Sequence, residues 1–306
     1  MTPTRIPKTE EKYLDRANGI INRYKKDSGQ TTVDIKTLVD WLVTVLQPTI
    51  VKSTWRHHRA AIAFYLEHND HGSEAVVAVK KIDGLNCKTE SVESSALKQK
   101  KLSNNDIESI ASKLNAVKNK WDGLILSWIE AAIVTGLRPS EWETALLKGN
   151  YLIVQNAKNT NGRTFGVERI LNLSELDEFS YEAIEKFIHK LHFAMRVNGG
   201  NFLFIYTCCR QRLRAITIKL WPPKKKHPTL YSARHQFSAD MKNILSMKEI
   251  AALMGHGTDA TATEHYGKKR YGTYKENHIT PDPEQVALIQ EKGVRLKKDS
   301  EKEHKS

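Results

Sequence analysis

Arg234, His256 and Tyr266 lie within one short stretch, residues 231–266, that is predicted to be mostly helical. A guanidinium holds a phosphodiester through a planar fork of donors, and an imidazole can donate a hydrogen bond to a further phosphate oxygen. A phenol hydroxyl can attack phosphorus. No set of metal ligands accompanies the three residues in this stretch. The stretch therefore indicates a phosphate-binding site with a phenol nucleophile.

Two residues earlier in the chain supply groups that this stretch lacks. Arg138 follows a predicted helix stop at Gly136 and precedes a proline, so it lies in a tight turn that can aim its side chain. Lys158 stands at the tip of a predicted β-hairpin, residues 151–173. Taken singly, each is more often an ordinary surface charge. Together they would complete a phosphate clamp and supply an acid for the leaving hydroxyl.

Five short motifs, in their order along the chain, resemble the catalytic domain of the tyrosine recombinase (phage integrase) family. They are Thr135-Gly-Leu-Arg138-Pro-Ser-Glu141, Lys158 in the hairpin, Tyr231-Ser-Ala-Arg234-His-Gln-Phe237, Leu253-Met-Gly-His256 and Glu264-His-Tyr266-Gly. The resemblance covers about residues 103–267. The N-terminal part is similar to the family's core-binding domain in size and position only.

The resemblance implies a role for each matched residue. Arg138 and Arg234 would clamp the scissile phosphate, and Lys158 would be the general acid. His256 would donate to the phosphate, and Tyr266 would be the nucleophile. No metal site is implied.

Two further positions are candidates because of the same resemblance. Glu141 is similar to an acidic family position that supports the site. Tyr231 departs from the family pattern, because many members have histidine three residues before the second arginine. Two roles therefore stay open for Tyr231, assistance in proton transfer or packing alone.

The function that the resemblance implies is site-specific DNA recombination or integration. The enzyme would cleave and rejoin DNA through a covalent 3'-phosphotyrosine, without metal, ATP or other cofactor. Its partner would be double-stranded DNA with a specific recombination site. The chain would assemble as a homotetramer on two DNA duplexes, and no membrane partner is expected. The enzyme would be encoded by a mobile element. It would be cytoplasmic and would associate with the nucleoid when bound to DNA.

Two alternatives compete with this interpretation. A type IB topoisomerase has a similar active site and relaxes DNA without exchanging partners, although the short chain and the small basic N-terminal part favour a recombinase. A catalytically silent DNA-binding protein of the same fold is the other alternative, and the departure at Tyr231 gives it slight support.

The choice of nucleophile rests on local sequence. An ordinary tyrosine has a pKa near 10, so roughly one in a thousand is ionised at neutral pH, and nearby guanidiniums would lower that pKa. Tyr271 and Tyr274 follow closely, but they lie beyond a basic stretch that has lost helical patterning. Tyr266 has the family's spacing from His256 and is the expected nucleophile.

The composition favours a polyanionic partner. The chain has 306 residues, with 48 Lys and Arg against 35 Asp and Glu, and a formal net charge of +13. This excess points to nucleic acid. The candidate DNA contacts are Lys52, Arg56 and Arg59 on one predicted helix and Arg210, Arg212 and Arg214 on another, although a solvated helix face also explains such runs.

The cysteine count and the hydropathy of the sequence limit the class of protein. Only three cysteines occur, two of them adjacent, so neither a disulfide framework nor a zinc site is expected. Residues 1–12 contain no apolar core of the kind a signal peptide has, and no window is long and apolar enough for a membrane span. A reducing cytosolic protein fits these observations best.

The predicted fold is mainly α-helical with a small β-hairpin or sheet. We expect a short tail at 1–8, a helical core-binding domain at 9–83, a linker at 84–101, a catalytic domain at 102–281 and a C-terminal helix with a charged tail at 282–306. The N-terminal domain is expected to hold four helices. Helices of the catalytic domain are predicted at 103–114, 121–134, 140–147, 175–197, 209–220, 230–244, 246–254 and 260–267, and a last one at 283–291, which would pack on its own domain or dock on a neighbouring subunit.

Overall fold

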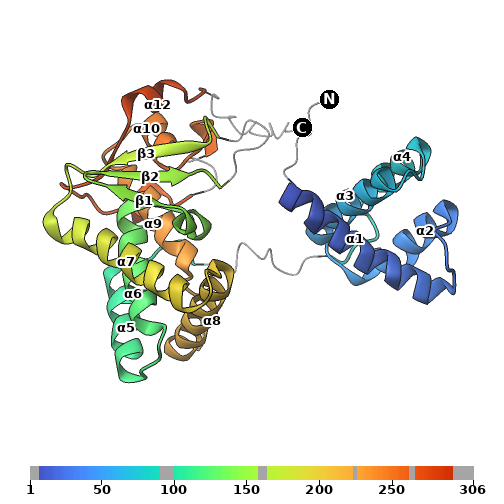
Figure 1. Cartoon of the computed structure of the whole chain (residues 1–306), viewed down its shortest axis with the longest axis horizontal. Coiled ribbons are helices and arrows are strands. Elements are labelled where there is room, and N and C mark those ends of the chain that lie inside the picture. The colour runs from blue at the N-terminus through green and yellow to red at the C-terminus, as the bar shows by residue number, and fades with distance from the viewer. Residues whose placement is uncertain (1–6, 90–98, 158–163, 223–225, 262–265, 292–306) are drawn as a thin grey trace, which may run out of the picture. The chain divides into compact units, whose positions relative to one another are not determined.

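The structure is a computed structural model that describes residues 7–89, 99–157, 164–222, 226–261 and 266–291. It divides into two compact units, Met1–Glu93 and Ser94–Ser306 (Figure 1). The described residues form mostly helices and one small antiparallel sheet. This confirms the predicted fold class. The assignment of the units as core-binding and catalytic domains stays a prediction.

The described part of the first unit, residues 7–89, forms four α-helices, as predicted. Its core is formed by side chains at helical spacing, among them Tyr24, Leu38, Trp55 and Ile62, all buried. Removal of such apolar side chains from water is the main force that holds helices of this length together. The helices are α1 (Pro7–Ser28), α2 (Ile35–Trp41), α3 (Lys52–His68) and α4 (Ser73–Lys81). The helical path of α2 continues through a π-helical turn, Leu42–Leu46, and a 3-10 turn, Gln47–Thr49.

In the second unit, helices surround α6, the most apolar of them. Trp128 of α6 is fully buried, and its ring centroid lies 5.2 Å from that of Phe187. Helices α7 and α9 pack directly against α6. The helices are α5 (Asn104–Ala116), α6 (Asp122–Thr135), α7 (Glu178–Val197), α8 (Phe202–Leu220), α9 (Leu230–Met241), α10 (Met247–Leu253) and α12 (Pro283–Ala287).

The sheet lies beside these helices in the order β1-β2-β3-β4, with antiparallel neighbours (Figure 1). Leu152 of β2 faces Leu171 of β3, and Val154 faces Arg169, and all four are buried. The pairing of β2 with β3 confirms the predicted hairpin. The strands are β1 (Leu146–Lys148), β2 (Tyr151–Gln155), β3 (Glu168–Asn172) and β4 (Thr280–Pro281).

The helices predicted to begin near residues 103 and 246 begin where expected. Ser103 and Asp106 form a reciprocal capping box at the start of α5, and Ser246 and Glu249 form another at α10. These bonds satisfy backbone N–H groups that a helix start leaves without partners.

The predicted helix at 140–147 is wrong. The chain forms a short 3-10 turn, η3 (Pro139–Glu143), and then enters strand β1. The helical propensity of this stretch is overridden because Leu146 to Lys148 pair with β2 across a tight turn at Gly149, whose φ is +53°. Pairing in a sheet decides the conformation here.

Other helix boundaries also differ from the prediction. Helix α8 begins at Phe202, before the predicted residue 209, because Asn201 caps it and Phe202 and Ile205 are buried. Helix α9 ends at Met241 and α12 at Ala287, earlier than predicted. The predicted helix at 260–267 does not reach its end, because Tyr266 lies in a bend and the residues between 261 and 266 are outside the described part of the chain.

The last helix packs on its own unit. Ile289, just after α12, is buried against Ala251 and Ala252 of α10, and Val286 joins the same cluster. The apolar side chains that could dock on a neighbouring subunit are thus partly used within the chain. None of the described helices is both long and apolar enough to cross a membrane.

Candidate active site

Arg138 is aimed by the turn that ends α6. Gly136 has a φ of +67°, and a Cβ at this position would overlap the ring of Phe237 on α9. Glycine is therefore required both for the left-handed backbone and for the close approach of the two helices. Two residues later Arg138, only 7% exposed, precedes η3 and projects into the unit.

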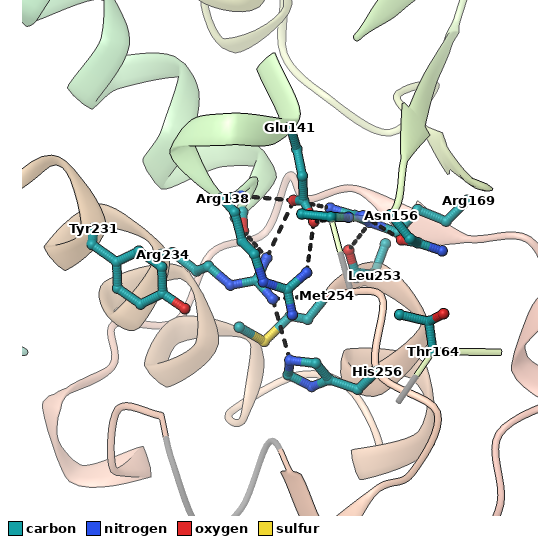
Figure 2. A network of polar contacts seen from close by, with 12 residues as sticks. Arg138, Glu141, Asn156, Thr164, Arg169, Tyr231, Arg234, Leu253, Met254 and His256 are labelled. Carbon is teal, nitrogen blue, oxygen red and sulfur yellow. Dashed lines mark hydrogen bonds and ion pairs between the residues drawn. The ribbon is translucent and has the colours of Figure 1, made fainter. Parts of the chain in front are cut away.

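Glu141 is the centre of a buried charge cluster (Figure 2). Its carboxylate accepts hydrogen bonds from Arg138 Nη1 at 2.6 Å and from Arg169 Nη2 at 2.7 Å. It also accepts the backbone N–H of Arg138 at 2.7 Å, and Arg234 Nη1 lies 3.7 Å away. Burial by itself raises the pKa of Glu141, but the three guanidiniums outweigh it and hold that pKa well below its usual range.

Arg169 belongs to the cluster although none of the sequence motifs includes it. It is fully buried on β3 and donates to Leu253 O at 2.8 Å and to Asn156 Oδ1 at 2.6 Å, in addition to Glu141. A signal was present in the sequence, because Arg169 has the same strand parity as the buried Leu171 and so falls on the inward face. A charge on an apolar face requires a buried partner.

Arg234 on α9 is fully buried, and its donors are directed by backbone carbonyls. Nη1 donates to Gly136 O at 2.6 Å, and Nη2 donates to Met254 O at 2.7 Å. Nη2 also lies 3.2 Å from His256 Nε2. Figure 2 shows Arg138, Arg234 and His256 converging on one region.

His256 follows a glycine that the packing requires. Gly255 has a φ of +62°, and a Cβ there would overlap the side-chain oxygen of Asn156. Burial, with the guanidiniums of Arg234 and Arg138, lowers the pKa of His256 well below its ordinary value, so the ring is neutral at pH 7. Because Nε2 accepts from Arg234, we assign the proton to Nδ1.

Two buried donors at this site have no hydrogen-bond partner within the part of the chain that the structure describes. They are Arg138 Nε and His256 Nδ1. A buried donor without a partner carries a free-energy cost unless a ligand or water satisfies it. Both donors are of the type that binds phosphate oxygens.

Tyr266 lies against the same arginines. Its hydroxyl oxygen is 3.3 Å from Arg234 Nε and 2.9 Å from the hydroxyl of Tyr231, and Arg234 Cζ lies 5.1 Å from the centre of its ring. Burial by itself raises the pKa of Tyr266. The guanidiniums of Arg234 and Arg138, with the hydrogen bonds from Tyr231 and Arg234, outweigh burial and lower the pKa to about 8.

Tyr231 has the opposite shift. Burial, together with the neighbouring Tyr266, raises the pKa of Tyr231 to about 12, although Arg234 lowers it in part. At neutral pH Tyr231 therefore keeps its proton. When Tyr266 ionises, Tyr231 must be the donor in the hydrogen bond between the two oxygens.

The structure brings together Arg138, Glu141, Tyr231, Arg234, His256 and Tyr266. Lys158 lies outside the described residues. The other candidate tyrosines point elsewhere: Tyr274 is 69% exposed, and the exposed Tyr271 accepts a hydrogen bond from its neighbour Arg270. The catalytic roles of the assembled residues stay predictions at this point.

The candidate DNA contacts differ in their availability. Arg210 and Arg214 are exposed on α8, and Lys52 and Arg56 are exposed on α3. Arg59 donates to Ile82 O at 2.8 Å and so fastens α3 to the end of α4.

Arg212 is not available as predicted. Its Nε and Nη2 bind both carboxylate oxygens of Asp122 at 2.8 and 2.9 Å, so it ties α8 to the start of α6. The bidentate pair occupies the edge of the guanidinium that a phosphate would take.

Among the residues that the structure covers, no three His, Cys, Asp or Glu side chains are grouped so that they could hold a metal ion. No protein-family model matches the chain, and no curated protein matches it either.

Solved structures match the chain over most of its length. A lambda integrase dimer bound to a COC' core site is 15% identical, with a TM-score of 0.45, over 87% of this chain and 79% of that one. The XerA recombinase is 13% identical, with a TM-score of 0.35, over 89% of each chain. The Tn1549 transposon integrase in complex with transposon right end DNA is 17% identical, with a TM-score of 0.45, over 80% of this chain and 82% of that one. The structures similar to this chain across most of its length are thus tyrosine recombinases and integrases.

Proposed function

We propose that this protein is a site-specific DNA recombinase or integrase that cleaves and rejoins DNA through a covalent 3'-phosphotyrosine. One observation carries the proposal: the hydroxyl of Tyr266 is held 3.3 Å from Arg234 Nε, and its pKa is lowered to about 8. At pH 7 about one Tyr266 in ten is then ionised, against roughly one in a thousand for an ordinary tyrosine. A phenol prepared in this way beside buried guanidiniums suits attack on a phosphodiester.

The charge of the cluster supports the same chemistry. Arg138, Arg169 and Arg234 carry three positive charges, and Glu141 carries one negative charge, so a net positive charge remains in a buried site. A phosphodiester that gains negative charge in its transition state is stabilised by such fixed positive groups. Arg138 Nε and His256 Nδ1 are donors that the phosphate oxygens would satisfy.

In the proposed step, the oxygen of Tyr266 bonds to phosphorus while the bond from phosphorus to the 5' oxygen of the DNA breaks. The leaving oxygen takes a proton, and we assign this proton to Lys158 from the sequence resemblance alone. The phosphotyrosine ester retains the energy of the broken bond, so a DNA hydroxyl can reverse the reaction on the same or another strand. We therefore propose that cleavage and rejoining use no metal ion or nucleotide cofactor.

The proposed partner is double-stranded DNA, in agreement with the net charge of +13. Assembly as a homotetramer on two duplexes and a setting in a mobile element are parts of the proposal that rest on the family resemblance.

The test begins with a library of random-sequence duplexes, from which the bound molecules are recovered and sequenced. Duplexes with the selected sequence are then nicked near its centre, so that cleavage releases a short strand and traps the covalent adduct. We expect wild type to form an adduct and Tyr266→Phe to form none while its DNA affinity persists. Tyr274→Phe is the matched control, because its ring is 69% exposed, and it should keep the adduct.

The other outcomes identify the alternatives. Binding without any adduct in wild type would indicate a catalytically silent DNA-binding protein. Adduct with plasmid relaxation, but without exchange of partners, would indicate a topoisomerase. An undiminished adduct in Tyr266→Phe would move the nucleophile to Tyr271 or Tyr274.

A further inference from the structure

The segment that follows Tyr266 lies against α9, the helix that carries Arg234. A Cβ on Gly267 would overlap the backbone oxygen of His235, and a Cβ on Gly272 would overlap the backbone oxygen of Ala239. The backbone of the segment therefore touches the backbone of α9 at two points, one helical turn apart along α9. Neither glycine has a positive φ, so close approach is the reason for glycine here.

A lysine fastens the near end of this segment. Lys242, which caps the C-terminus of α9, donates from Nζ to the carbonyl oxygen of Gly267 at 2.7 Å. Gly267 is the residue directly after Tyr266. The half-buried ammonium thus holds the backbone next to the proposed nucleophile.

Two buried side chains fasten the far end. Gln236 Nε2 donates to Tyr271 O at 2.9 Å, and Asp240 Oδ1 accepts the backbone N–H of Thr273 at 2.8 Å. Gln236 Nε2 also donates to Asp240 Oδ1 at 2.9 Å, and Gln236 Oε1 accepts the N–H of Leu102. The two side chains lie one turn apart on α9, and their mutual bond fixes the orientation of the amide.

We propose that Lys242, Gln236 and Asp240 form a clamp that positions Tyr266 against Arg234 of the same chain, so that nucleophile and phosphate clamp share one rigid helix. The proposal rests on the proposed function. None of the three side chains contacts the hydroxyl of Tyr266 in the structure, so they are positioning residues. They act through hydrogen bonds to the backbone near the two ends of the seven-residue span from Gly267 to Thr273.

Positioning of this kind has a measurable consequence. When reacting groups are held in a productive geometry, a displacement of about 1 Å costs on the order of 100-fold in rate. A displaced Tyr266 would also move away from Arg234, whose charge lowers its pKa. Loss of the clamp should therefore change both the rate of cleavage and the titration of the phenol.

The central variant is Lys242→Met, which keeps the length of the side chain and removes the donor. Its matched control is Lys190→Met, because Lys190 is also half-buried and also donates to a backbone carbonyl, that of Gly123 at 3.2 Å, on the side of the unit formed by α6 and α7. Gln236→Met tests the far end of the clamp and changes no charge. Lys242→Arg keeps a donor and should restore part of the function.

Two measurements are made on the full chain. The first is the rate of adduct formation in a single turnover, with the selected nicked duplex in excess, together with the affinity for that duplex. The second is the ultraviolet titration of the phenol, taken as the difference between each variant and the same variant with Tyr266→Phe, which needs no DNA. We expect Lys242→Met and Gln236→Met to form adduct about ten- to a hundredfold more slowly at unchanged affinity. The titration midpoint of Tyr266 should move from about 8 toward 10.

Two results overturn different claims. If Lys242→Met and Gln236→Met match Lys190→Met in rate and in titration, the clamp is wrong, and an adduct in wild type still supports the proposed function. If wild type forms no adduct, the proposed function is wrong. The titration then decides the clamp by itself, because an unmoved midpoint in both variants contradicts it.

Discussion

At the scale of single residues, the main feature of the site is that its buried positive charges outnumber its negative charge. Glu141 bonds to Arg138 and Arg169 and lies 3.7 Å from Arg234, so one carboxylate holds three guanidiniums in place without neutralising them. In a buried site the excess positive charge acts strongly on any nearby group that can become negative. Tyr266 is such a group, and the phosphate of the proposed substrate is another.

Tyr231 gives the first prediction at this scale. Its hydroxyl lies 2.9 Å from that of Tyr266 and can donate to the ionised oxygen, and this bond helps to lower the pKa of Tyr266 to about 8. Tyr231→Phe removes the donor, so the pKa of Tyr266 should rise. Since a shift of one pKa unit changes the ionised fraction about tenfold, adduct formation near pH 7 should slow by up to about tenfold.

The sign of the pH dependence follows from the reactive form. Only the ionised phenol attacks phosphorus, so the rate of wild type should increase with pH and level off above about 8. In Tyr231→Phe the inflection should lie at higher pH, which makes the defect largest below pH 8 and absent above the new inflection. Single-turnover rates measured from about pH 6 to about pH 10 cover both inflections. An inflection identical to that of wild type would show that Tyr231 only packs.

At the scale of elements, the turn after α6 links packing to the site. Gly136 lets α6 and α9 approach until the ring of Phe237 lies against it, and its carbonyl oxygen accepts a hydrogen bond from Arg234. The same turn sets the direction of Arg138, two residues later. One residue therefore connects both arginines of the proposed clamp on the phosphate.

Gly136→Ala should be strongly destabilising. The variant has the cost of a left-handed alanine, about 1 kcal/mol, and in addition the overlap with Phe237, which brings the total to about 3 kcal/mol. Gly149→Ala is the matched control, because its φ of +53° carries the first cost and nothing lies within 4 Å of its Cβ. Urea unfolding at equilibrium measures both free energies. Equal losses in the two variants would contradict the role of Phe237.

At the scale of the whole molecule, the formal net charge is +13, and not every basic side chain is free to contact the proposed DNA partner. Arg212 shows why a count of charges misleads. It is one of three arginines at alternate positions, and it is paired with Asp122, while Arg210 and Arg214 stay exposed. The amino-acid composition does not distinguish an arginine in a structural ion pair from an arginine that is free to bind DNA.

The three arginines of α8 should therefore behave differently when replaced by glutamine. Arg210→Gln and Arg214→Gln together should weaken DNA binding and reduce the slope of log K against log salt by about 0.9 for each phosphate that is no longer neutralised, without a change in stability. Arg212→Gln leaves Asp122 without its charged partner and should lower the free energy of unfolding by about 2 kcal/mol. Salt titrations of duplex binding and urea unfolding measure the two effects. A salt slope unchanged in the double variant would place the DNA surface away from α8.

The sequence by itself determined the features that depend on near neighbours. The stop at Gly136, the helix starts near Ser103 and Ser246 and the pairing of β2 with β3 all depend on short stretches of the chain, and they were predicted. The motifs of the candidate site could also be identified from the sequence, because each motif is short. Local hydrogen bonds and backbone restrictions of this kind are set mainly by residues close in the chain.

Only the tertiary structure decided what each charged or polar side chain contacts. The helix predicted at 140–147 became a strand because β2 pairs with it, and Arg212 became an ion pair because Asp122, 90 residues earlier, lies beside it. Arg169 joined the charge cluster through partners on two other segments, and the hydroxyl of Tyr231 came to lie 2.9 Å from that of Tyr266 only through the packing of the fold. Burial makes an unpaired charge or donor costly, so the partner decides the role of a buried polar group, and partners distant in the chain become neighbours only when the chain has folded.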